Sequence, residues 1–274
     1  MTEARSCVAV SMEGEVATIT LSGEGYDLEN ITALGEAIAR LSELPMMRAI
    51  VIQGTRDSFW LGASPSLLVK MSEGVRSDRF EIVRRGQANV RCILQSPKLI
   101  VAYVDGFAAG GGVDLMLACD LVLVTNRSRV NLFYGKLGVV PDHGGLFLLA
   151  QHLGWARALR CAESCPSWSA PELLQLGLAE REVPAGIELG SWERVLRREM
   201  RVPVSMRSAL KAIRWSAISP EIEAHFVEVA DLMADLLGLA EQRTLLAKVR
   251  AMQAITSSSK LLKRSDDHAE SRST

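Results

Sequence analysis

The sequence predicts an α/β fold in which a layered core of parallel strands is followed by a helical C-terminal region. Runs of continuous apolar residues, typical of strands covered on both faces, alternate with helical segments in the first half of the chain. From about residue 145 onward the pattern is mostly helical. We therefore expect a folded core over residues 1–200, a helical region over 201–255, and a disordered polar tail over 256–274.

The first half of the chain supplies the expected strands and the helices between them. The strands follow alternating or continuous apolar patterns and are expected at 7–11, 15–21, 47–54, 98–106 and 120–125. Helices with apolar residues at helical spacing are expected at 30–42, at 76–95 and from the glycines at 110–112. Asn30 is the expected cap of the first helix, and Pro97 follows the end of the second.

The second half is expected to be built from helices. Ser169 and Glu172 form a capping-box pattern, with Pro171 in the first turn, which predicts a helix start. Further helices are expected at 203–216 and 219–253. The last of these carries apolar residues around more of its surface than one core face requires, which indicates a second contact surface.

Composition excludes several classes of partner. Lys and Arg (31) nearly balance Asp and Glu (32), which argues against nucleic acid or an anionic membrane as the main partner. The N-terminal stretch carries acids where a signal peptide would carry bases. Five cysteines, an odd number, favour reduced thiols and a cytoplasmic location. Cys161 and Cys165 lie four residues apart without a second Cys or His pair, so we expect no metal site.

Three consecutive glycines, Gly110 to Gly112, lie between apolar segments in GFAAGGGVDLMLACD, and Asp114 follows them. Glycine lets another backbone segment or a ligand approach closely. A helix N-terminus also carries a partial positive charge, which stabilises negative charge nearby. The run therefore indicates either tight packing of helix on strand or a site for negative charge that develops on a substrate oxygen.

Several motifs in this order resemble the crotonase family, the enoyl-CoA hydratases and isomerases. They are GFAAGGGVDLMLACDLVLVT, GVVPDHGGLFLLAQHLG and SAPELLQLGLAEREVP, preceded by MRAIVIQG and SFWLGAS. The resemblance covers roughly residues 8–255. It implies a ββα spiral core and a C-terminal region that forms a lid or joins subunits in a homotrimer or hexamer. It also implies an acyl-CoA or acyl-carrier-protein thioester as substrate, with coenzyme A or phosphopantetheine as its carrier part and no other cofactor.

The resemblance also places an oxyanion hole and its acids. The two backbone N–H donors of the family match Ala63 and Gly111, and the first acid of the hydratases matches Asp114. A first-turn acid favoured by the helix dipole is the simpler interpretation of Asp114. The second hydratase acid is replaced by Tyr134, which cannot act as a carboxylate base near neutral pH. Ordinary two-acid hydration is therefore not expected.

Asp142 decides between the chemistries of the family. It stands where many members have glycine, and the dienoyl-CoA isomerases and ring-type (PaaG-like) isomerases resemble this chain in having aspartate there. We therefore favour double-bond isomerisation, in which Asp142 moves the proton, Asp114 assists, and Tyr134 orients the substrate or Asp142. Alternatives are a turn role for Asp142, a hydratase, dehydratase or decarboxylase, and a catalytically silent scaffold. His143 is expected at the surface or behind the site.

The substrate contacts are expected from residues around the two N–H donors and from the last helix. These residues are Trp60, Leu61, Gly62, Gly110, Phe133 and Lys248. The lysines that usually meet the CoA phosphates are replaced by Asp57, Ser64 and Ser66. Weak phosphate anchoring leaves open a substrate carried by an acyl carrier protein, as in polyketide pathways, as well as one carried by CoA.

Overall fold

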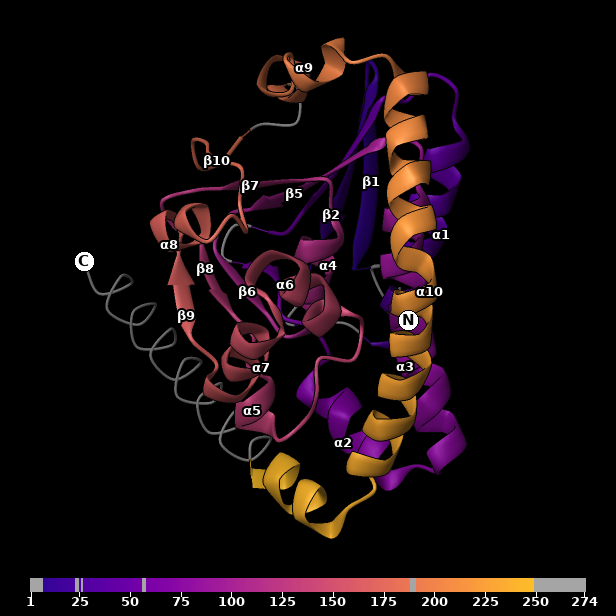
Figure 1. Ribbon diagram of the computed structural model, residues 1–274, viewed down its shortest axis with the longest axis vertical. Coiled ribbons are helices and arrows are strands. Elements are labelled where there is room, and N and C mark those ends of the chain that lie inside the picture. Colours follow the sequence, from indigo (N-terminus) through magenta and orange to yellow (C-terminus); the bar gives the residue numbers. More distant parts are fainter. Residues whose placement is uncertain (1–6, 23–24, 26, 56–57, 188–190, 249–274) are drawn as a thin grey trace, which may run out of the picture.

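The computed structural model describes residues 7–22, 25, 27–55, 58–187 and 191–248, so the expected tail lies outside the described residues. Its strands form two sheets, one of six strands in the order β1-β2-β3-β5-β7-β10 and one of four in the order β4-β6-β8-β9 (Figure 1). The predicted α/β class is confirmed.

The larger sheet contains all five strands expected from the sequence. Its strands are β1 (Val8–Glu13), β2 (Val16–Leu21), β3 (Ala49–Gln53), β5 (Leu99–Val104), β7 (Leu121–Val124) and β10 (Arg181–Glu182). β1 and β2 pair antiparallel, whereas β2, β3, β5, β7 and β10 pair in parallel. Every residue of β5 is buried, because one face packs against the main core and the other against Trp192 and Leu196. This double cover explains the continuous apolar pattern of the central strands.

The smaller sheet positions the site. It comprises β4 (Ser58–Trp60), β6 (Phe107–Ala109), β8 (Arg129–Asn131) and β9 (Ser167–Ser169). β4, β6 and β8 each follow a strand of the larger sheet, which gives the ββα spiral that the resemblance implied. These three strands are parallel neighbours, so their carboxyl ends meet at one edge.

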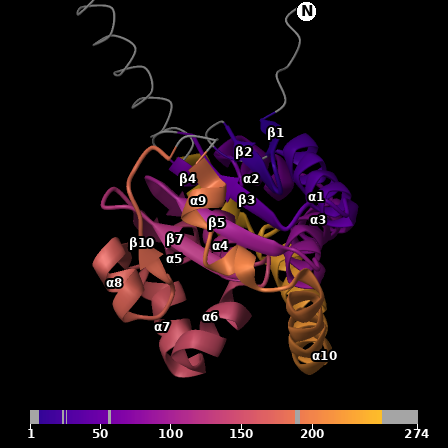
Figure 2. The same ribbon diagram turned by 90° about the horizontal axis from the view of Figure 1, so that it is seen from above.

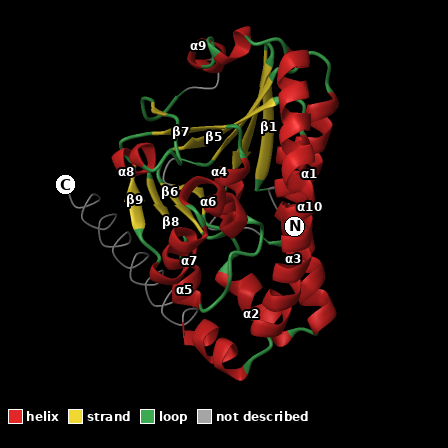
Figure 3. Ribbon diagram, viewed as in Figure 1, coloured by secondary structure: helices red, strands yellow, loops and turns green. Residues whose placement is uncertain are grey.

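Helices surround the two sheets (Figure 3). They are α1 (Leu28–Glu43), α2 (Pro65–Glu73), α3 (Arg76–Gln95), α4 (Gly111–Ala118), α5 (Tyr134–Leu137), α6 (Gly145–Leu153), α7 (Trp155–Ser164), α8 (Ala170–Gln175), α9 (Trp192–Val195) and α10 (Val204–Leu236). The predicted capping box at the start of α8 is present. The predicted cap of α1 is wrong, because Asp27 accepts the Asn30 N–H and Asn30 itself is buried within the helix.

The C-terminal region holds two helical segments, as expected, but they divide near residue 238 and not between 216 and 219. α10 continues through Pro220 and ends at Leu236, and residues 240–248 are again helical. It packs along α3, and Figure 2 shows α1, α3 and α10 grouped on one side of the strands. Phe226 and Met233 of α10 enter the main core, so this region and the spiral share one apolar interior. Among the described helices, none has the length and apolarity to cross a membrane.

Candidate active site

Two backbone segments meet where β4 and β6 end. The chain leaves β4 through Leu61, Gly62 and Ala63, and leaves β6 through Gly110 into α4, which begins at Gly111. Gly62 has a left-handed backbone (φ +74°), and a Cβ on it would lie 2.6 Å from the Gly111 nitrogen. Glycine thus brings the two segments into direct contact.

Because of this contact, the two residues predicted to supply the oxyanion-hole N–H groups line the same pocket. Ala63 and Gly111 both line it, and Gly111 is the first residue of α4. The first N–H groups of a helix have no acceptor within the helix, and they carry its partial positive charge. A Cβ on Gly112 would lie 2.1 Å from the Trp60 carbonyl oxygen, so the third glycine serves the packing of α4 on β4. The packing interpretation of the glycine run therefore holds for Gly112, and the oxyanion role of Gly111 stays a prediction.

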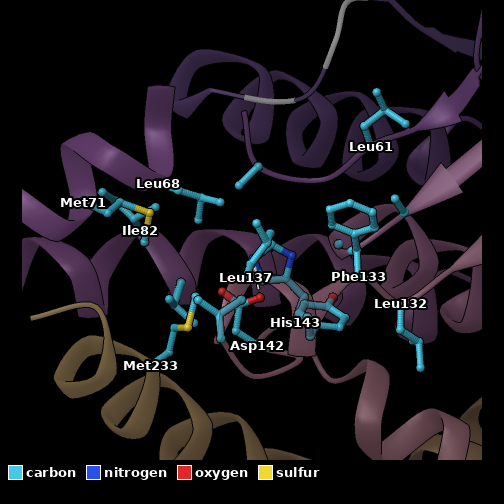
Figure 4. A pocket seen from close by; sticks show the side chains of 17 residues that line it. Leu61, Leu68, Met71, Ile82, Leu132, Phe133, Leu137, Asp142, His143 and Met233 are labelled. Atoms are coloured by element: carbon cyan, nitrogen blue, oxygen red, sulfur yellow. Dashed lines mark ion pairs between the residues drawn. The ribbon is translucent and has the colours of Figure 1, made fainter. Parts of the chain in front are cut away.

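The pocket encloses about 560 Å³ of empty space, part of it open to solvent, and most of its wall is apolar (Figure 4). Leu68 and Met71 of α2, Ile82 of α3, Leu137 of α5 and Met233 of α10 form this wall. Such a lining suits an acyl chain better than a charged group.

Asp114 lies in the first turn of α4 and is fully buried. The Tyr134 hydroxyl donates to Asp114 Oδ1 (2.7 Å), and the His143 backbone N–H donates to Oδ2 (3.1 Å). Burial raises the pKa of Asp114 to about 6, against the opposing effects of the His143 imidazole and the Tyr134 hydrogen bond. Tyr134 also lines the pocket, so its expected role in orienting Asp142 or the substrate stays a prediction beside this contact with Asp114.

Asp142 lies in the loop before α6 and lines the pocket. Its side chain is buried, and burial raises the pKa of Asp142 to about 7, opposed by its own backbone N–H. The Gln87 side-chain amide donates to the backbone oxygens of Asp142 and Phe226, both at 2.8 Å. α3 therefore ties the Asp142 loop to α10.

His143 lies closer to the pocket than the sequence indicates. Of its two expected places, at the surface or behind the site, the first is wrong, because His143 is 5% exposed and lines the pocket. Its Nε2 lies 3.7 Å from Asp142 Oδ1 (Figure 4). The ring packs onto Gly86 of α3, and burial lowers the pKa of His143. A glycine inside the otherwise amphipathic 76–95 segment was the available signal, because such a glycine often marks a close approach.

The remaining predicted substrate residues divide into three groups. Leu61, Gly110 and Phe133 line the pocket, and Phe133 holds a left-handed backbone (φ +64°) rare for a bulky residue. Trp60 is buried and lines a second, small cavity between α1, α3 and α4, and it is not among the described residues that line the first pocket. Lys248 is exposed and is not among the described residues that line either cavity.

The two acids and His143 also have the composition of a metal site. One ligand atom from each of Asp114, Asp142 and His143 lies within 4.8 Å of the others. Both oxygens of Asp114 already accept hydrogen bonds from Tyr134 and from the His143 backbone. Each oxygen keeps a second lone pair, so these contacts do not decide the matter and the expectation of no metal stays a prediction.

The spiral of paired strands, with two glycine-lined segments meeting above one apolar pocket, defines the crotonase class of fold. A family model for enoyl-CoA hydratase/isomerase matches residues 12–243. The chain therefore belongs to the enoyl-CoA hydratase/isomerase family.

Similar proteins within this family carry several activities. Human ethylmalonyl-CoA decarboxylase is 24% identical over 206 residues, which are 74% of this chain and 65% of that protein. Carnitinyl-CoA dehydratase of Salmonella enteritidis is 29% identical over 64% of this chain and 67% of its own length. The match thus spans about two thirds of these relatives. The solved enoyl-CoA hydratase of Bacillus halodurans is 25% identical with a TM-score of 0.81, over 89% of this chain and all of that one.

Proposed function

We propose that this protein isomerises the double bond of an enoyl thioester, with Asp142 as the group that moves the proton. One observation carries the proposal: of the two acids at this site, Asp114 accepts a hydrogen bond on each oxygen, whereas the contacts of the Asp142 carboxylate with the described residues are its own backbone N–H and the His143 imidazole at 3.7 Å. It faces an apolar pocket beside Ala63 and Gly111. The aspartate at this position is also the feature in which the sequence resembles the dienoyl-CoA and ring-type isomerases.

The proposed reaction uses the two backbone N–H groups and one carboxylate. The thioester oxygen accepts hydrogen bonds from Ala63 and Gly111. The Asp142 carboxylate takes a proton from C2 of a 3-enoyl thioester, and the C–H electron pair forms an enolate held by these donors. The Asp142 carboxylic acid then returns the proton to C4, which leaves the double bond between C2 and C3. A carboxyl with a pKa near 7 is suited to both steps.

The geometry favours this reaction over two others. Hydration in this family uses two acids to hold water, whereas here Tyr134 occupies the second position and its hydroxyl donates to Asp114. Decarboxylation needs a substrate carboxylate in the pocket. The described residues that line the pocket include one acid, Asp142, with Asp114 buried behind it, and no lysine or arginine that could pair with a substrate carboxylate.

We further propose that the acyl group arrives on coenzyme A or on the phosphopantetheine of a carrier protein, and that no other cofactor takes part. We also propose a trimer or hexamer. Met206, Leu210 and Ile213 of α10 are 55%, 54% and 67% exposed and lie at helical spacing on one face, which supports association. Native mass spectrometry of the protein and of an Ile213→Glu variant would test it, and a monomeric wild-type protein would refute it.

Deuterium exchange tests the reaction. The protein is incubated in deuterium oxide with 2-enoyl and 3-enoyl thioesters, each on CoA and on pantetheine, and Asp142→Asn is run beside the wild type. We expect a shifted double bond with deuterium uptake, lost in Asp142→Asn. A gain of one water would indicate hydration. No exchange with any thioester, in folded protein that still binds a thioether analogue, would favour the scaffold.

A further inference from the structure

We infer that His143 positions Asp142 for proton transfer, by donating an Nε2–H hydrogen bond to its carboxylate, and that Gly86 provides the space from which the imidazole does so. This inference rests on the proposed role of Asp142. It makes His143 a positioning residue, because it acts through the carboxylate.

Three contacts fix the imidazole beside the carboxylate. The His143 backbone N–H is bound to Asp114 Oδ2, which holds the main chain against α4. The ring lies directly on the backbone of α3, where a Cβ on Gly86 would come within 2.0 Å of Nε2. Any side chain at Gly86 would therefore displace the imidazole. Nε2 is left 3.7 Å from Asp142 Oδ1.

Two consecutive residues of α3, Gly86 and Gln87, contact two consecutive residues of the loop before α6. Gln87 binds the backbone oxygen of Asp142, and Gly86 makes room for the ring of His143. The same Gln87 amide binds the Phe226 oxygen of α10, so the position of the loop is fixed from two helices. The ring also lines both cavities, which makes it the wall between the acyl pocket and the smaller cavity.

The chemistry of the pocket suits a neutral donor. Burial lowers the pKa of His143, so the imidazole is neutral and carries one N–H. The titratable groups around Asp142 are Asp114, Tyr134 and His143, while the lining residues of α2, α3 and α10 are apolar. A separation of 3.7 Å is too long for a hydrogen bond, but a shift of about 1 Å on substrate binding would form one.

The test compares two variants of His143, one without a side-chain hydrogen-bond donor and one with a donor. His143→Leu removes the donor, and His143→Gln supplies an amide N–H. In His143→Leu we expect kcat to fall about 30-fold with KM within about threefold, and the acid limb of the kcat profile, which reports the substrate complex, to move to higher pH. The limb moves because the ionised carboxylate loses a donor that stabilises it. His143→Gln should restore the limb to near its wild-type position.

A second pair of variants separates positioning from folding. Gly86→Ala should lower both thermal stability and activity, because the new methyl group displaces the ring. Gly86→Ala with His143→Ala should recover the stability and leave the activity low, since the space is freed but the donor is absent.

Carboxyl NMR titration of Asp142 in the complex with a non-reactive thioether analogue gives a readout that needs no turnover. A pKa of Asp142 that is higher in His143→Leu than in wild type supports the inference. An unchanged pKa and acid limb, with Asp142→Asn inactive, would overturn the inference and leave the proposed function standing. Full activity in Asp142→Asn would overturn both.

Discussion

Asp114 and Asp142 are two buried aspartates of one site, and they are held in opposite ways. Asp114 accepts one hydrogen bond on each oxygen, from Tyr134 and from the His143 backbone. At the Asp142 carboxylate the described contacts are its own backbone N–H and the His143 imidazole at 3.7 Å. The pKa of Asp142, about 7, is correspondingly above that of Asp114, about 6.

The difference indicates a division of labour between the two acids. A carboxylate with both oxygens bound is an efficient anchor, because any proton transfer would break existing bonds. Asp114 thus joins α4, α5 and the loop before α6, and Gly145 is required beside it because a Cβ there would lie 1.9 Å from Oδ1. Asp142, with fewer contacts, is the acid proposed to take and return a proton. Four predictions test this division, from the largest expected effect to the smallest.

The first prediction compares the loss of each acid on turnover. Asp142→Asn should lower the isomerisation rate about 10³-fold, because the general base is removed. Asp114→Asn should lower the isomerisation rate only about tenfold, because it weakens the hydrogen bonds that hold the site together but leaves the Asp142 base in place. Single-turnover kinetics of both variants check this, and binding of a thioether analogue shows that each site is still formed. An equal or larger loss in Asp114→Asn would reverse the assignment.

The second prediction concerns the pH dependence of activity. The base must be ionised, so kcat/KM should fall about tenfold for each pH unit below about pH 7, the pKa of Asp142. The midpoint of this acid limb should match the pKa of Asp142 and not that of Asp114. A pH profile of Asp114→Asn is the control, and a limb near pH 6 in the wild type that vanishes in this variant would contradict the prediction.

The third prediction concerns stability. Both carboxyls have a raised pKa in the folded protein, so between about pH 4 and pH 7 the folded state binds more protons than the unfolded state. Their contribution is therefore fully present at pH 4 and is lost as pH rises through 6 and 7. Asp142→Asn should stabilise the protein at pH 8 by on the order of 2 kcal/mol and by little at pH 4. Thermal unfolding at both pH values measures this, and the same change at both would refute it.

Much of the fold was predictable because it depends on local patterns. The 76–95 helix coincides with α3, and the continuous apolar runs coincide with β3, β5 and β7. These elements were predictable because the spacing of apolar residues along a short segment indicates both its secondary structure and its buried face. The spiral itself and the pairing of Ala63 with Gly111 at one site came from the family resemblance. The cap of α1 and the unbroken α10 were missed, because tertiary packing overrides the signals of Asn30 and Pro220.

The partners of the site residues could not be predicted. Asp114, Tyr134 and His143 are within hydrogen-bonding reach only because β6, β8 and α6 converge, and the separation along the chain does not specify such pairs. The adjacency of Asp142 and His143 suggested that their side chains diverge. Gly86, more than fifty residues earlier, is what lets the His143 ring turn inward.

The last prediction tests the hydrogen bond from Tyr134 to Asp114 by removing the tyrosine hydroxyl. Tyr134→Phe deletes the 2.7 Å hydrogen bond to Oδ1 and keeps the ring that lines the pocket. The pKa of Asp114 should rise, because a donor to its ionised form is lost, and stability at pH 8 should fall by about 1–2 kcal/mol. The acid limb of kcat/KM should stay where it is, since Asp142 keeps its contacts, and kcat should change by less than about fivefold. Urea unfolding and a pH profile of the same variant measure both effects. If the limb moved with Tyr134→Phe while stability did not change, Asp114 would be the titrating base, and the roles of the two acids would have to be exchanged.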